Sequence, residues 1–591
     1  MTTALLLCFE ASAAQASTIA SEPLEKTSQN VRRRSIFSFQ DLTSMALDTI
    51  AVRLLGKPAD VPIEFDPSLS FWFNRALWFN IFGNTLVPHT AKFSRPQDEK
   101  QPIVPVAKLG FGSGYAKVFT SKDAPASEKS TVSKILFSIL EKFNGFFPLT
   151  RGNLPPMPED PDAILDLMFS EQHYKVLPPP VYTPLLKHNQ HDLIAALSLE
   201  GPFANLIEHV ACNRYKIDLN NYQKYSVKKG LYPLGAVAEL DYEDGQMRTA
   251  LIRYKGVDYF PPHIKLEGAD EWKRVQKILL ATMHTETVFF SHLLNTHIII
   301  AGTFSAVNND FLDKDHPLRK LMHPQQVGTL STNDYQIGLL IGDKNQFFPE
   351  IFSYDKDVID MMFKDFIEKF EFKKMDIHEN LKTRKMNSQH IAYQYHKNTN
   401  DIWKIFESFV SKTVDHYYGQ YESDEKFVQD HEEIKSWYEE LERRIPNGIS
   451  DYATIFAERD EYSSNGLTRA SLKKLITTFM YTVTAHHKNV SQITYNYTPW
   501  LQDIPTVVNL DGTLPNIGIL QTNMNLTYAT NDPSTTLVDS WSYLFDDELK
   551  GYADEFTAAM RDLQEKYDSM ENHNPNLTML LPNQIGTSVN T

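Results

Sequence analysis

Two histidines five residues apart, His292 and His297, stand in an uncharged apolar stretch that reads SHLLNTHIIIAGTF from Ser291. Neutral imidazole nitrogens are common ligands for iron, manganese and zinc. On a regular α-helix, residues five apart diverge by roughly 140°, so the pair can share one ion only if a turn between them widens. A π-bulge widens a helix in this way and is frequent at functional sites. The pair is therefore either two core histidines satisfied by backbone carbonyls, or two metal ligands on a helix with a widened turn.

A second histidine pair ends another mostly apolar stretch, which reads LITTFMYTVTAHHKNVS. In it, His487 and Ser491 are four residues apart and share one face of a helix. A hydroxyl is a weak metal ligand and would leave a soft or open coordination position. The neighbouring His486 points about 100° away from His487, and spacing alone does not choose between these two histidines.

Together with the C-terminal run MLLPNQIGTSVNT, the two histidine segments resemble the catalytic domain of lipoxygenases. That family holds a non-heme iron, or manganese in some fungal members, with two His of an H-x4-H helix, one His of a later helix and the C-terminal main-chain carboxylate. Other segments fall in the family order: LYPLGAV at 231–237, Trp272 twenty residues before His292, and HPLRKLMHP from His316. The resemblance covers residues from about 195 to 591.

The resemblance implies a metal site made of His292, His297, His487, Ser491 and the α-carboxylate of Thr591. It implies one non-heme iron ion per chain, with manganese as the alternative. Most relatives end in Ile or Val rather than Thr, but the ligand would be the main-chain carboxylate, which is ionised above about pH 4 whatever the side chain is.

The resemblance also implies substrate contacts near the run IGLLIG. Leu340 falls where a family Leu clamps the substrate, with ordinary core packing as the competing interpretation. Gln336, or Gly338 if a gap is introduced, falls where the family controls the site of oxygen attack.

The activity that the resemblance implies is that of a dioxygenase. It would insert O2 into a polyunsaturated fatty acid with a cis,cis-1,4-pentadiene, such as linoleate, to give a hydroperoxide after hydrogen abstraction by a metal(III) hydroxide. Departures from the family keep open an inert lipid-binding pseudoenzyme. They are Thr287 and Val288, where many relatives have His and Gln, Thr494, where Gln is frequent, and the terminal Thr591. A second alternative is a hydroperoxide isomerase, because the same metal site can perform this reaction when oxygen access is poor.

Periodicity predicts a mainly α fold with a small antiparallel β-hairpin or sheet, and the resemblance implies that this fold is a large helical lipoxygenase-like catalytic domain. Helical spacing covers 271–301, 356–374, 430–444 and 467–490, and period-two alternation flanks the Gly-containing turn after 240. We expect a disordered or leader segment at 1–35 and a single catalytic domain at 36–591. Within it, 36–190 would be a helical or irregular cover and 191–591 the metal-binding helical core. No β-barrel pattern precedes this core, as in compact bacterial and fungal relatives.

Composition narrows the partners. A net charge of −16 argues against nucleic acid, since phosphate contacts need a basic face. Two cysteines, Cys8 and Cys212, exclude a disulfide scaffold and a thiolate metal cluster.

The apolar start with its A-x-A pattern favours secretion, with a cytoplasmic location as the alternative. The sequence contains no apolar run of 18 or more residues, so no membrane span is predicted. The aromatic segment from Phe71 is predicted to lie in the core, with a lid or a membrane-touching edge as the alternatives. We expect a monomer.

Overall fold

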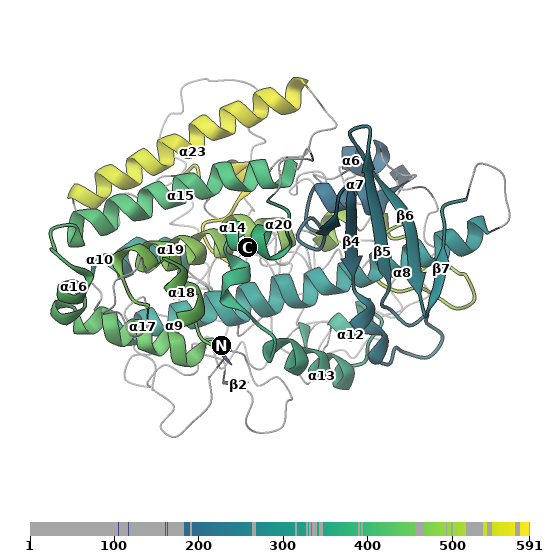
Figure 1. Cartoon of the computed structure of the whole chain (residues 1–591), viewed down its shortest axis with the longest axis horizontal. Coiled ribbons are helices and arrows are strands. Elements are labelled where there is room, and N and C mark those ends of the chain that lie inside the picture. The colour runs from purple at the N-terminus through teal and green to yellow at the C-terminus, as the bar shows by residue number, and fades with distance from the viewer. Residues whose placement is uncertain are drawn as a thin grey trace, which may run out of the picture.

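One continuous helix, Ala269–Asn308, crosses the middle of the protein (Figure 1). It consists of the α-helix α8 (Ala269–Glu286), the π-helix η3 (Thr287–Gly302) and the beginning of α9 (Thr303–Phe311). This computed structural model describes residues 104–105, 116–117, 160, 162–163, 183–188, 192–262, 268–313, 316–326, 329, 333, 340–341, 347–387, 391, 394–456, 466–491, 493–497, 500–515, 536–539, 547–573 and 580–589.

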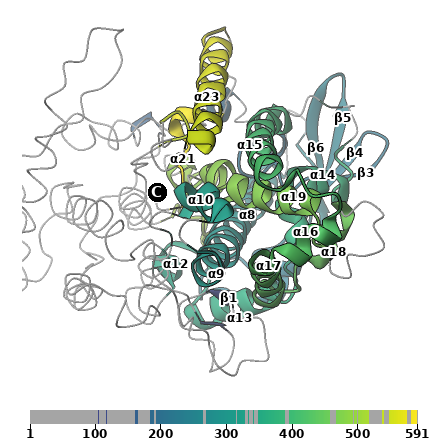
Figure 2. The ribbon, with the colours of Figure 1, turned by 90° about the vertical axis from the view of Figure 1, so that its left-hand side faces the viewer.

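The central helix is apolar because it forms the core. By length and composition it could cross a membrane, but 83% of its most apolar window is buried inside the protein. Viewed nearly along its axis, it is enclosed by other helices (Figure 2). They include α10 (Pro317–Met322), α13 (Lys356–Ile367), α17 (Glu432–Arg444) and α19 (Arg469–Tyr481).

A buried polar network fixes the far end of the central helix. The guanidinium of Arg444 in α17 pairs with Asp310 of α9 at 3.2 Å and with Glu440 one turn earlier. The indole N–H of Trp437 donates to the side-chain oxygen of Asn308. Because buried charges are tolerated only when they are paired, this network holds α17 against α9 in one register.

Two long antiparallel helices cover one side of the core (Figure 1). These are α15 (Gln394–Tyr418) and α23 (Asp547–His573). Phe556 of α23 packs against two rings of α15. Its ring centroid lies 5.1 Å from that of Phe406 and 5.3 Å from that of Phe409. The Tyr567 hydroxyl donates to the main-chain carbonyl of Asn398 at 3.2 Å. The remaining helical segments are α6 (Thr183–His188), α7 (Leu193–Leu199), η2 (Asn220–Lys224), η4 (His323–Gln326), α12 (Phe347–Ile351), η5 (Phe372–Met375), α14 (Ile377–Thr383), α16 (Asp424–Asp430), α18 (Ser450–Phe456), η6 (Thr482–His486), α20 (His487–Ser491), α21 (Ile493–Tyr497) and η9 (Pro582–Gln584).

An antiparallel sheet of five strands lies at one end of the central helix, in the order β3-β4-β5-β6-β7. The predicted hairpin is confirmed as β5 and β6, and its turn has positive φ at Asp244 and Gly245, as two-residue hairpins require. The other three strands were not predicted. The strands are β3 (Glu208–Ala211), β4 (Arg214–Asp218), β5 (Val237–Glu243), β6 (Gln246–Tyr254) and β7 (Val257–Tyr259).

Gly235 explains why the LYPLGAV segment joins this sheet to the core. Its φ is +103°, and a Cβ at this position would lie 2.7 Å from the backbone nitrogen of Gln223. Its N–H donates to the Thr282 hydroxyl of α8 at 3.0 Å. Only glycine permits this φ together with such a close approach to η2, and the segment can therefore lie where it bonds α8.

Three of the four predicted helices are confirmed, although 467–490 divides into α19, η6 and α20. The prediction of one helix over 356–374 was wrong beyond Ile367. Phe370 and Phe372 are both buried, and the extended Glu371 between them has φ −134° and ψ 116°. Two core aromatics at a spacing of two need extended backbone, which interrupts the helix.

The predictions for residues 1–190 lie almost entirely outside the described residues. The exceptions are short, among them β1 (Val104–Pro105), which pairs in parallel with β2 (Ala116–Lys117), and α6. The leader, the N-terminal cover, the aromatic segment from Phe71 and the secreted location therefore stay predictions.

His284 of α8 is a buried histidine whose two ring nitrogens have no hydrogen-bond partner among the residues that the structure describes. Its ring packs edge-on against Phe352 and Tyr497. Burial disfavours the charged imidazolium and lowers the pKa of His284 to about 3. The unfolded chain takes up this proton near pH 6.5 but the folded chain does not, so this group makes stability fall as pH drops from 6.5 towards 3.

Replacing His284 by Phe removes this pH dependence. We expect the stability of His284→Phe relative to the wild type to increase by about 2 kcal/mol between pH 7 and pH 5, because each pKa unit corresponds to about 1.4 kcal/mol. Urea unfolding at several pH values measures the free energy of unfolding of both proteins. The control is His416→Phe, which replaces an exposed histidine of α15 and should show no such pH dependence relative to the wild type. A difference from the wild type that is the same at pH 5 and pH 7 contradicts the prediction.

Candidate metal site

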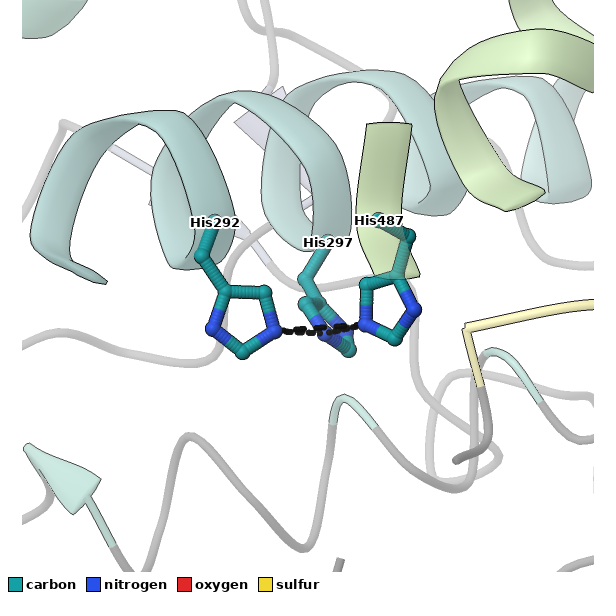
Figure 3. A group of neighbouring side chains, drawn as sticks. All are labelled: His292, His297 and His487. Atoms are coloured by element: carbon teal, nitrogen blue, oxygen red, sulfur yellow. Dashed lines mark hydrogen bonds between the residues drawn. The ribbon is translucent and has the colours of Figure 1, made fainter. Parts of the chain in front are cut away.

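Three imidazoles converge at the middle of the central helix (Figure 3). His292 and His297 come from η3, and His487 is the first residue of α20. The Nε2 atom of His297 lies 3.0 Å from that of His292 and 2.9 Å from that of His487, and the third separation is 3.2 Å. The choice that spacing left open falls on His487, because His486 turns away and hydrogen-bonds the main-chain carbonyl of Ser291.

The widened helix that this convergence requires is present. Residues 287–302 form a π-helix, in which the backbone hydrogen bonds join residues five apart instead of four. His292 and His297 therefore lie on the same face, one turn apart. The Thr296 hydroxyl donates to the carbonyl of Ser291, five residues earlier, at 2.7 Å. A second π-helical turn, η6, ends directly before His487. Both segments that carry the histidines thus depart from α-helical geometry at the site.

The three histidines are neutral near pH 7. Burial lowers the pKa of His297 to about 4, although the hydrogen bond to Asn333 opposes this. Burial, together with the neighbouring histidines, holds the pKa values of His292 and His487 well below the usual range. The Nδ1–H of His297 donates to the side-chain oxygen of Asn333 at 3.0 Å, so its Nε2 carries a lone pair. Lone pairs crowded at 3 Å repel one another unless a cation lies among them.

The nitrogen triangle fits a metal ion with open coordination positions. An imidazole nitrogen lies about 2.1 Å from a bound transition metal. At this distance, tetrahedral angles would separate the nitrogens by about 3.4 Å and right angles by about 3.0 Å. The observed separations of 2.9 to 3.2 Å fit right angles. Three ligands at right angles occupy one face of an octahedron and leave three positions for other groups.

Two further ligands were predicted. Ser491 is partly exposed and ends α20, one turn after His487. Thr591 lies outside the described residues, but the chain before it is anchored in the core: the N–H of Leu580 donates to Asn398 at 2.6 Å, and Val589 is buried. Neither residue is tested as a ligand by these contacts, so both stay predictions.

The predicted substrate residues are only partly described. Leu340 is buried in the core, which agrees with both core packing and a place in a channel wall. Gln336 and Gly338 lie outside the described residues. Thr287 and Val288 are both buried one turn before His292, and within the described part of the chain the Thr287 hydroxyl has no hydrogen-bond partner. His316 has a structural role, since its Nδ1 caps α10 by accepting from the N–H of Leu318 at 3.2 Å.

A polar cavity of about 180 Å³ lies beside the histidines, against a neighbouring face of η3. Burial raises the pKa of Glu286 in its wall to about 7, and the Tyr222 hydroxyl donates to this carboxyl group. The cavity is smaller than the roughly 300 Å³ typical of small-molecule pockets. Its polar lining consists of Asn205, Glu286, Ser291, Asn295, Lys374, Asn380, Arg384, Tyr395, His396, Thr399, Tyr481 and His486.

Asn333 is a residue of the site that no sequence pattern marks. It is buried and follows His297 by 36 residues, in the polar run LSTNDYQ. Its spacing to the histidines matches no helical or strand period, so only the three-dimensional structure brings it to the site.

The Thr296 hydroxyl offers a direct test of the widened turn. We expect Thr296→Val to lose about 1 kcal/mol of stability, the usual contribution of one hydrogen bond. We also expect it to bind Co2+ about 10-fold more weakly, because the turn that aligns the two histidines loses support. Urea unfolding and titration of the visible Co2+ absorbance measure the two effects.

The matched control is Thr285→Val. The Thr285 hydroxyl donates to the carbonyl of Ala281 at 2.9 Å within the regular α8. This variant loses the same kind of bond, so it should lose similar stability and keep the Co2+ affinity of the wild type. Equal Co2+ affinities of both variants would show that the Thr296 bond does not support the site.

Comparison with known proteins agrees with this geometry. The family model described as Lipoxygenase matches residues 259–541. The polyunsaturated fatty acid lipoxygenase ALOX8 of Mus musculus is 25% identical over 222 residues, which cover 37% of this chain and 30% of that protein. The probable linoleate 9S-lipoxygenase 3 of Solanum tuberosum is 26% identical over 226 residues, which cover 37% of this chain and 25% of that protein. Both matches therefore span less than a third of the relative.

The fold similarity extends further than the sequence similarity. The crystal structure of coral 8R-lipoxygenase superimposes with a TM-score of 0.64 and 15% identity, covering 85% of this chain and 79% of that one. The predicted fold class, mainly helical with a small antiparallel sheet, is confirmed. All three converging histidines lie within residues 259–541, the region that is similar to the lipoxygenase family model.

Proposed function

We propose that this protein is a lipoxygenase, a non-heme metal dioxygenase that adds O2 to a polyunsaturated fatty acid containing a cis,cis-1,4-pentadiene. The observation that carries this proposal is the convergence of three neutral imidazoles within the region that matches the family. One C–H bond of the doubly allylic methylene breaks, one C–O bond forms, and the hydrogen ends on the product hydroperoxide. The names of the two relatives, which specify polyunsaturated fatty acids and linoleate, support this substrate class.

We assign the metal to His292, His297 and His487, with Ser491 and the α-carboxylate of Thr591 completing the set. A bound iron ion supplies reversible one-electron chemistry between its +2 and +3 states, and manganese is the alternative. Three imidazoles and a carboxylate without a thiolate suit such an ion. The hydroxyl of Ser491 is a weak ligand, which leaves coordination space beside the histidines.

The protein's own contribution is to position these groups and to exclude water. Burial keeps the three histidines neutral, so their lone pairs stay available down to mildly acidic pH. The apolar residues around η3, among them Phe289 and Ile298, supply a dry environment for a lipid radical. Leu340, on the segment that follows Asn333, is our candidate for a contact with the acyl chain.

The decisive experiment incubates the protein with linoleate and follows conjugated-diene absorbance and O2 consumption, with the metal content measured on the same sample. We expect one iron or manganese per chain and a hydroperoxide product. Removing the metal with a chelator should abolish activity, and re-addition of Fe2+ or Mn2+ should identify the working ion.

We expect His487→Ala to lose the metal and at least 100-fold of the activity, because a three-nitrogen site becomes a two-nitrogen site. His416→Ala, on the exposed face of α15, is the control and should keep both. A metal-loaded wild type that yields no diene and consumes no O2 refutes the proposal. Conversion of added fatty-acid hydroperoxides without O2 uptake would identify an isomerase instead, and tight fatty-acid binding without metal would identify a pseudoenzyme.

A further inference from the structure

Asn333 makes two hydrogen bonds to one residue, His297. Its side-chain oxygen accepts from the Nδ1–H of His297 at 3.0 Å, and its amide nitrogen donates to the main-chain carbonyl of His297 at 2.7 Å. Asn333 is 1% exposed. One side chain therefore holds both the ring and the backbone of a residue in the histidine cluster.

This pair of bonds fixes the chemistry of His297 without ambiguity. A carbonyl oxygen only accepts, so the NH2 group of Asn333 must face it. The oxygen of Asn333 then faces the ring and only accepts as well, so Nδ1 must carry the proton. A neutral imidazole has one N–H, and Nε2 is left with the lone pair that points at His292 and His487.

We infer that Asn333 is a positioning residue that sets the tautomer and ring orientation of His297 and tunes how strongly its Nε2 donates to a metal. This inference rests on the proposed function only in requiring that the site binds a metal ion. Partners of this kind on metal-binding histidines typically change metal affinity 10 to 100-fold when they are removed.

The neutrality of Asn333 has a specific consequence. A carboxylate in its place would accept a charge-assisted hydrogen bond about twice as strong, pull the Nδ1 proton towards itself and make Nε2 a stronger donor. A stronger donor favours the +3 ion over the +2 ion. The amide of Asn333 thus keeps the metal easier to reduce than a carboxylate would, and only the amide also donates to the main-chain carbonyl of His297.

The test compares Asn333→Leu and Asn333→Asp with the wild type. The control is Asn308→Leu, which removes another fully buried asparagine, the partner of Trp437 in α9. Three quantities are measured for each protein: unfolding in urea, Co2+ affinity by competition with a chelator, and the midpoint potential of the iron-loaded form. None of them depends on fatty-acid turnover.

We expect Asn333→Leu to bind Co2+ 10 to 100-fold more weakly. Asn333→Asp should keep Co2+ affinity within a few-fold of the wild type or exceed it and shift the midpoint potential to more negative values. Asn308→Leu should lose stability while its Co2+ affinity and potential stay those of the wild type.

Wild-type Co2+ affinity in Asn333→Leu overturns the inference, as does an unchanged potential in Asn333→Asp. An equal loss of Co2+ affinity in Asn333→Leu, Asn333→Asp and Asn308→Leu also overturns the inference, because it would show that Asn333 has a merely structural role. A wild type that binds metal but oxygenates no lipid refutes the proposed function and leaves this inference standing if the variants behave as expected. A wild type that binds no metal refutes both.

Discussion

Three imidazole nitrogens held about 3 Å apart in an apolar core are the constraint on which the rest of this structure depends. Uncharged rings survive there because burial prevents protonation, and their lone pairs can face one another only around a cation. The backbone must bring together two residues that a regular α-helix would separate by roughly 140°. The π-helix at residues 287–302 meets this requirement, with the Thr296 hydroxyl bonded to the carbonyl of Ser291.

A widened helix is costly, so the surroundings must hold it. At one end, Gly235 lies close against η2 and donates its N–H to the Thr282 hydroxyl of α8. At the other end, Arg444 of α17 holds α9 through its buried ion pair with Asp310. Contacts on both flanks hold the helix ends, and the π-helix lies between them, where the histidines need it.

The sequence was sufficient for the features that repeat locally. Periodicity predicted the central helix and the hairpin, and the demand that His292 and His297 meet predicted the widened turn. The sequence could not decide between His486 and His487. Their side chains point about 100° apart on a helix, and which of them faces the other histidines depends on how the two helices pack. Periodicity overextended the helix after Ile367, since Phe370 and Phe372 look apolar in any secondary structure. Asn333 was missed because its contact with His297 joins residues 36 apart through no periodic pattern.

The departures at Thr287 and Val288 acquire a physical meaning from Asn333. Where many relatives have polar side chains one turn before the first histidine, this chain has a hydroxyl without a partner and an apolar side chain, both buried. Among the described residues, the one side chain outside the cluster seen to hydrogen-bond a ring nitrogen of the three histidines is Asn333, on His297. Orientation that the family resemblance would assign to the turn before His292 thus enters from Asn333, which bonds both the ring and the main-chain carbonyl of His297.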